Sequence, residues 1–115
     1  MKNFTLIGLL LSAAIANADC VDSENILKLK ESSKDRIIGP FSVSRLERKN
    51  LVEIEETGKK IPFGYVNEQW VMLKSMMKEG DAIYRHKHKD GRFAAETIVL
   101  VRNNCVVFSF LLWIT

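Results

Sequence analysis

The chain lacks most of the features by which an enzyme is recognised. None of its serines stands in a Gly-x-Ser-x-Gly context, it has no glycine-rich phosphate loop, and it has no Cys-x-x-Cys pair. Internal repeats, low-complexity tracts and linkers rich in proline or glycine are also missing from its 115 residues. We therefore expect a non-catalytic protein without a cofactor.

Long hydrophobic segments are scarce as well. The apolar runs Phe4 to Ile15 and Cys105 to Ile114 are both shorter than the roughly 20 residues that span a bilayer. Lys2 precedes the first run and Ala16-Asn17-Ala18 follows it, which is the arrangement of a secretory signal peptide with its cleavage site.

These features predict a signal peptide at residues 1–18 and one small domain at residues 19–115, exported to the periplasm or secreted. Lipidation of Cys20 is an alternative, but Asp19 stands where the lipoprotein signal has a small residue.

Cysteine occurs at only two positions, Cys20 and Cys105, near opposite ends of the exported chain. Thiols oxidise in exported compartments, so we expect one disulfide between them that ties the N-terminal segment to the last strand. For so long a loop the chain-entropy model gives at most about 4–5 kcal/mol of stabilisation.

Charge of one sign is not in large excess, since the formal net charge is +3. Most of the positive excess falls in one segment, the basic hairpin, which comprises Arg85, Lys87, Lys89 and Arg92. This is too little charge to indicate nucleic-acid binding. The hairpin could instead bind an acidic partner protein or, more weakly, the surface of an anionic membrane, or it could simply be solvated.

The first half of the chain predicts short elements. Residues 23–33 favour a short helix beginning at Asp22 or Ser23, although Leu27 and Leu29 also alternate with lysines as in a strand. Further on, alternating apolar residues predict two strands around 38–43 and 52–54, with a turn at 48–50 between them. A turn at 56–59 then precedes residues 61–65, where Pro62 allows only an edge strand or irregular structure.

The segment from Val66 to Gly80 predicts the main helix. Trp70, Leu73 and Met77 share one face at helical spacing, as residues of the core do. Asn67 is the expected N-cap, Val66 and Val71 fit a hydrophobic staple, and Gly80 is the expected C-terminal stop.

Three strands are expected after this helix, at residues 82–88, 93–102 and 105–114, with a tight turn at Asp90-Gly91 and another at Asn103-Asn104. The last two strands lack clean alternation, which favours central strands covered on both faces. The predicted fold class is α+β: an antiparallel sheet centred on a C-terminal three-strand meander, with one main helix packed across it and one disulfide.

The two histidines, His86 and His88, stand at i and i+2 and would point to the same face of a strand, as metal ligands sometimes do. Two ligands make an incomplete site, and Asp90 or Glu96 are the nearest candidates for a third. Neighbouring Arg85, Lys87 and Lys89 oppose a cation. We therefore expect no metal site here.

A further pattern extends from residue 63 to the C-terminus. It consists of Phe63-Gly64-Tyr65, Gln69-Trp70, Leu73-Lys74, Met77, Gly80-Asp81, Ile83-Tyr84, Leu100-Val101-Arg102 and the terminal strand. In these residues the chain resembles a group of small exported bacterial proteins of uncharacterised function. The resemblance implies a helix-to-strand fold and no particular activity.

The sequence as a whole predicts a small exported, disulfide-stapled protein that binds another envelope or secreted protein. One alternative is a periplasmic inhibitor or immunity protein that acts against a secreted enzyme. Another is a small metal-binding protein or hydrolase that uses His86 and His88, and a structural envelope protein without a specific partner is the third.

Overall fold

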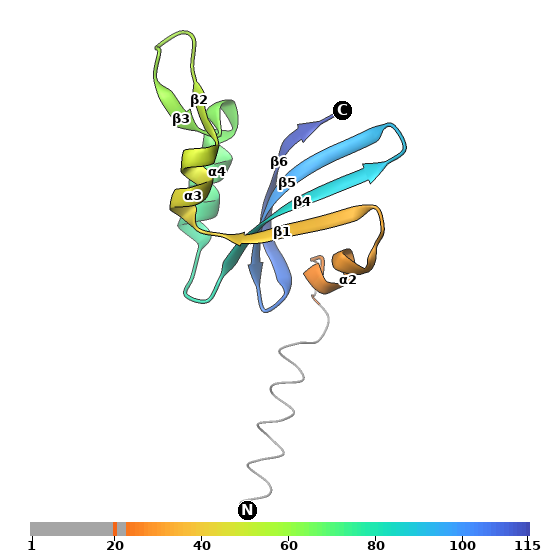
Figure 1. Ribbon diagram of the computed structural model, residues 1–115. Helices are drawn as coiled ribbons and strands as arrows, with labels where there is room; N and C mark the ends of the chain where they lie inside the picture. The colour runs from red at the N-terminus through yellow and green to blue at the C-terminus, as the bar shows by residue number, and fades with distance from the viewer. Residues whose placement is uncertain (1–19, 21–22) are drawn as a thin grey trace, which may run out of the picture.

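The computed structural model describes residue 20 and residues 23–115 (Figure 1). The predicted signal peptide, residues 1–18, lies outside these described residues. Within them, no helix has both the length and the apolar character needed to cross a membrane. The elements, in chain order, are α2 (Ile26–Glu31), β1 (Asp35–Phe41), α3 (Val43–Lys49), β2 (Leu51–Glu53), β3 (Lys60–Pro62), the 3-10 helix η1 (Gly64–Val66), α4 (Asn67–Met76), β4 (Ala82–Asp90), β5 (Phe93–Arg102) and β6 (Cys105–Ile114).

A four-stranded antiparallel sheet with the order β1-β4-β5-β6 forms the centre of the fold. The α+β class, the C-terminal meander, the main helix and the disulfide are as predicted. The two turns of the meander also fall where expected. Gly91 and Arg92 connect β4 to β5, while Asn103 and Asn104, both with positive φ, connect β5 to β6.

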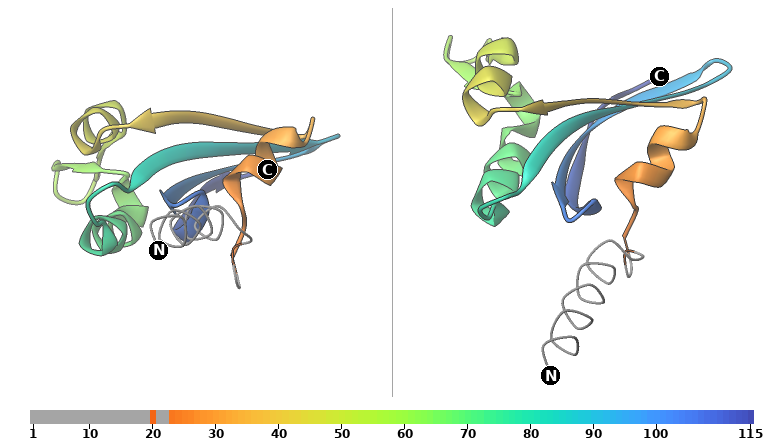
Figure 2. Two further views of the ribbon diagram at one scale, coloured as in Figure 1. Left: turned by 90° about the horizontal axis from the view of Figure 1, so that it is seen from below. Right: turned by 60° about the horizontal axis from the view of Figure 1, so that its bottom comes forward.

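One face of the sheet packs against α3 and α4. Leu46 of α3 and Trp70 and Leu73 of α4 are buried there, together with Phe63. From the sheet they meet Ile83, Ile98, Leu100 and Phe110. Figure 2 shows these two helices together at one end of the sheet, which leaves the far end of this face uncovered by helices.

The opposite face packs against the short helix α2. Ile26 is buried there against Val99 and Val101, and the side chain of Asn25 accepts a hydrogen bond from the backbone of Leu27 as the N-cap. The helix predicted in this region is confirmed, although it begins a few residues later than expected. Because β5 is buried on both faces, its apolar run does not alternate, as predicted.

The last strand differs from the prediction. β6 lies at an edge of the sheet rather than in its centre, and Leu111, Trp113 and Ile114 are exposed. Its run of apolar residues therefore does not mark a strand covered on both faces. The centre of the sheet consists of β4 and β5, the first two strands of the meander, and β1 and β6 are its edges.

Both strands predicted around residues 38–43 and 52–54 are present, as β1 and β2, but the prediction that a simple turn joins them as a pair is wrong. Residues 43–49 form α3, because the hydroxyl of Ser42 caps the helix by accepting a hydrogen bond from the backbone of Arg45. The spacing of Val43 and Leu46 then turns both side chains toward the core. β2 pairs with β3 instead of β1, so Pro62 ends a strand of a small separate sheet.

The main helix α4 is confirmed, but its predicted ends are wrong. The side chain of Asn67 donates a hydrogen bond to the Pro62 carbonyl and does not cap the helix. Val71 is exposed, so it forms no hydrophobic staple. The helix stops at Met76, and Gly80, with a φ of 89°, lies in the turn before β4.

The predicted disulfide between Cys20 and Cys105 is present and closes a loop of 85 residues. It fastens the N-terminal segment to the first residue of β6. Backbone hydrogen bonds from Ile26 to Asn104 and from Val106 to Glu24 hold the same junction. Helix α2 is thus attached to the sheet by one covalent bond and by a few local contacts.

Replacing both cysteines by serine should lower the free energy of unfolding by about 2–4 kcal/mol, because the unfolded chain regains the freedom of a long loop. Urea denaturation of residues 19–115 measures this loss. Reducing the disulfide of the wild-type protein should reproduce it. A loss below about 1 kcal/mol would show that the disulfide is not a main support of the fold.

Asp81 and Arg102 join the end of the main helix to the sheet. The guanidinium of Arg102 donates to both carboxylate oxygens of Asp81, with Nε to Oδ1 at 2.9 Å and a terminal nitrogen to Oδ2 at 2.8 Å, and also to the carbonyl of Met76. The backbone of Lys78 donates to the same carboxylate. The hydrogen bonds from Arg102 hold the pKa of Asp81 below its ordinary value, against the opposing effect of burial.

Asp81→Asn should lower the free energy of unfolding at pH 7 by about 1–3 kcal/mol. The pKa of Asp81 is lower in the folded than in the unfolded chain, so its stabilisation is complete above the unfolded value and is lost as the pH falls through the folded value. The difference between wild type and variant should therefore shrink between about pH 5 and about pH 2 in urea denaturation series. A pH-independent difference would contradict this role.

Candidate functional site

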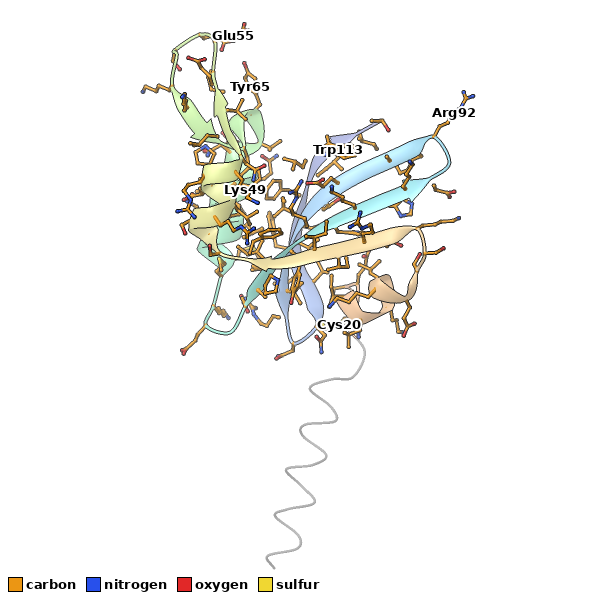
Figure 3. All side chains as sticks on the ribbon, viewed as in Figure 1. Cys20, Lys49, Glu55, Tyr65, Arg92 and Trp113 are labelled. Carbon is orange, nitrogen blue, oxygen red and sulfur yellow. A yellow bond between two sulfur atoms is a disulfide. The ribbon has the colours of Figure 1, made fainter. Side chains whose placement is uncertain are left out.

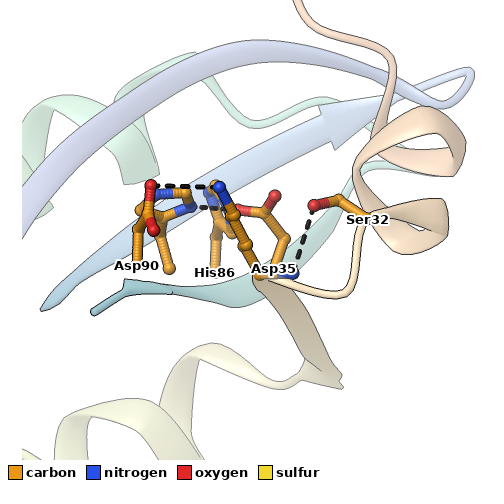
Figure 4. Close-up of polar contacts among 6 residues, drawn as sticks. Ser32, Asp35, His86 and Asp90 are labelled. Atoms are coloured by element: carbon orange, nitrogen blue, oxygen red, sulfur yellow. Dashed lines mark hydrogen bonds and ion pairs between the residues drawn. The ribbon is translucent and has the colours of Figure 1, made fainter. Parts of the chain in front are cut away.

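Asp35, His86 and His88 form a polar group on the face of the sheet that α2 partly covers, and we call it the histidine cluster. Oδ1 of Asp35 lies 2.6 Å from Nε2 of His86 and 2.8 Å from Nδ1 of His88. One carboxylate oxygen thus accepts from both rings. Figure 4 shows His86 beside Asp35, with the hydrogen bonds among the residues drawn as dashed lines.

The strand geometry explains why these three side chains meet. His86 and His88 are two residues apart on β4 and so point to the same face, as predicted. Asp35 is paired directly with His88 across the β1–β4 ladder, and it therefore shares that face. Neighbouring strands of one sheet hold all three residues, which fixes their backbones.

The surroundings of Asp35 favour its charged form. Its side chain is only 9% exposed, and this burial raises its pKa. Hydrogen bonds from His86, His88 and Ser32 outweigh the burial and lower the pKa below its ordinary value. The cluster therefore presents a carboxylate that is shielded from solvent and held by two imidazoles.

The three residues also form a group with the composition of a metal site. One ligand atom from each lies within 4.8 Å of the others, and no second group of this kind occurs among the residues that the structure describes. The third member of the group is Asp35, and not Asp90 or Glu96 as the sequence suggests. Asp90 instead pairs with Lys34 at 3.1 Å, and Glu96 lies on the opposite face.

Nothing local in the sequence marks Asp35 as the third member. It precedes His86 by 51 residues and reaches it only through the pairing of β1 with β4. The alternation of Asp35 and Ile37 with Arg36 and Ile38 could have placed it on one face of a strand. That alternation does not show which strand lies next to β1.

The basic hairpin is divided between two environments. Arg85 and Lys87 lie on the face opposite the histidines and both approach Glu96, with Nε of Arg85 2.7 Å from Oε2 and Nζ of Lys87 3.8 Å from Oε1. Glu96 is only 1% exposed. Lys89 and Arg92 make no ion pair with any other described residue. The hairpin therefore carries less uncompensated positive charge than its sequence indicates.

The uncovered end of this face forms a surface that we call the basic face. It consists of Arg36, Arg85, Lys87, Lys89 and Trp113, arranged around Glu96. Arg36 pairs with Lys87 across the ladder, and Trp113 pairs with Glu96. Trp113 is 42% exposed and lines a hollow of about 330 Å³ together with Arg36, Lys87, Lys89 and one member of the histidine cluster, His88.

Figure 3 shows Trp113 between the tip of the β4–β5 hairpin and the helical end of the molecule. Trp113 lies on β6 and Arg92 lies at the tip of the β4–β5 hairpin. Lys49 and Tyr65 lie at the other end, on α3 and η1. The helical end thus offers exposed cationic and aromatic side chains outside the basic face.

Comparisons of the chain with protein-family models, with curated proteins and with solved structures found no match. The resemblance to small exported bacterial proteins therefore stays a prediction. What the chain does has to be inferred from its own geometry, which places a carboxylate with two imidazoles on one face of the sheet and cations with a tryptophan on the other.

Glu96→Ala should lower the free energy of unfolding by about 3 kcal/mol, because it leaves Arg85 without its buried partner. Glu96→Gln, which keeps a hydrogen-bond acceptor, should cost less. Asp90→Ala is the matched control, since it breaks an exposed ion pair with Lys34 and should cost less than about 1 kcal/mol. Equal losses for Glu96→Ala and Asp90→Ala in urea denaturation would contradict the role of Glu96.

Proposed function

We propose that the protein is a small exported binding module of the bacterial envelope that engages an acidic protein partner through its basic face. The observation that carries this proposal is Trp113, which remains 42% exposed beside a row of cations. Tryptophan and arginine are the residues most enriched among those that dominate binding energy in protein interfaces. The proposal requires no catalytic group and no cofactor.

The charge of this surface supports an acidic partner. Arg36, Lys87 and Lys89 line the hollow beside Trp113, and Arg85 contributes a fourth cation. The only carboxylate of the basic face, Glu96, is buried beneath Arg85 and Lys87. A partner therefore meets an excess of positive charge around an open aromatic ring, which favours association with acidic side chains and makes it sensitive to salt.

The disulfide and the covalently attached N-terminal segment fit a protein that works in an oxidising compartment. An inhibitor or immunity protein that protects the cell against a secreted enzyme is one form that such a module can take. In that case the acidic surface belongs to the enzyme.

The test compares variants of oxidised residues 19–115 for binding to a protein that the wild type retains from an envelope extract. Trp113→Ala and the double variant Arg36→Glu with Lys89→Glu should each weaken the affinity for the purified partner at least tenfold in calorimetry. Arg85 is left unchanged, because it balances the buried Glu96. Binding by the wild type should weaken as salt is raised.

Matched controls come from the helical end of the molecule. Tyr65→Ala removes a ring that is 78% exposed, and Lys49→Glu with Lys59→Glu reverses two exposed cations. These variants should bind like the wild type. Equal weakening by both sets, or retention by anionic phospholipid vesicles with no protein partner, would reject the proposal.

A further inference from the structure

The histidine cluster and the basic face lie on opposite faces of the sheet, so a role for one does not require the other. We propose that Asp35, His86 and His88 bind one divalent transition-metal ion, with zinc as the most suitable probe. Nothing in the proposed function of the basic face uses these three residues.

The ligand types select the class of ion. Two imidazole nitrogens and one carboxylate oxygen suit zinc, copper and nickel. Calcium and magnesium prefer oxygen ligands throughout, and the cluster supplies one carboxylate. The site is therefore directed at a transition metal.

The distances allow coordination with a small adjustment of the side chains. Nε2 of His86 and Nδ1 of His88 lie 2.6 and 2.8 Å from Oδ1 of Asp35. Ligand atoms around a tetrahedral zinc ion are about 3.3 Å apart. The ion would replace the two hydrogen bonds, and each ligand atom would move by less than about 1 Å.

The sheet also removes the electrostatic objection that the sequence raises. Arg85, Lys87 and Lys89 alternate with the histidines along β4, so their side chains leave the opposite face. Two of these cations approach Glu96 there. On the side of the histidine cluster, Lys34 is paired with Asp90. A bound cation would therefore face the carboxylate of Asp35 without an unpaired lysine of β4 beside it.

Access to the site is open on one side. His86 lines a surface hollow of about 430 Å³ together with Thr97 and Ser109. Side chains of Asp35 and His86 are otherwise mostly covered, with 9% and 15% exposure. Of the three ligands, His86 borders this hollow and His88 is the most exposed, at 34%. A water molecule or an outside ligand could therefore reach the fourth position, as in an open zinc site.

Zinc titration of oxidised residues 19–115 by calorimetry tests the proposal. The wild type should bind one equivalent, and His86→Ala, His88→Ala and Asp35→Asn should each weaken the affinity at least tenfold. Asp90→Asn is the matched control, because it removes a nearby carboxylate that lies outside the cluster, and it should bind like the wild type. Circular dichroism verifies that each variant is folded.

Nuclear magnetic resonance locates the bound ion independently of the variants. The chain has only two histidines, so its imidazole signals are readily assigned. Zinc should shift the signals of both rings at one equivalent. Binding that leaves either ring unshifted, binding that survives His86→Ala in a folded variant, or no binding by the wild type would overturn the proposal.

Discussion

The pairing of β4 between β1 and β5 is the constraint on which the rest of the structure depends. A strand in that position cannot rotate, so its alternating residues are committed to two separate surfaces. Histidines go to one side and arginine and lysines to the other, although they are mixed along the chain. A shift of one residue in the register would exchange the two sets of side chains. Cations of β4 would then replace the histidines on the face that carries Asp35.

The sequence predicted the elements whose evidence is local. The spacing of Trp70 and Leu73 predicts α4, and the asparagine and glycine turns predict the meander. Helix α3 was missed because Phe41 and Val43 alternate across its N-cap and resemble a strand. β6 was placed in the centre because its apolar side chains are compatible with burial, and no local feature of a sequence tells which strand lies at the edge of a sheet.

The same distinction between local patterns and contacts distant in sequence applies to the candidate sites. The shared face of His86 and His88 follows from their spacing, whereas Asp35 joins them only through a contact distant in sequence. The cations of the basic hairpin can be counted in the sequence, but the sequence does not show which of them lie close to a carboxylate. Glu96 sits beneath Arg85 and Lys87, while Arg36 arrives from β1 and Trp113 from β6. Both surfaces are products of strand pairing.

The positions of the two cysteines also determine when during synthesis the disulfide can form. Cys20 precedes every strand of the sheet, whereas Cys105 is the first residue of β6, so the partner of Cys20 is made only after β1 to β5. Helix α2 docks on residues that border this cysteine, through Ile26 and Asn104. The segment around Cys20 can therefore be fastened only after the strands that follow it have been made, and a chain truncated before residue 105 would lack the cysteine that holds it.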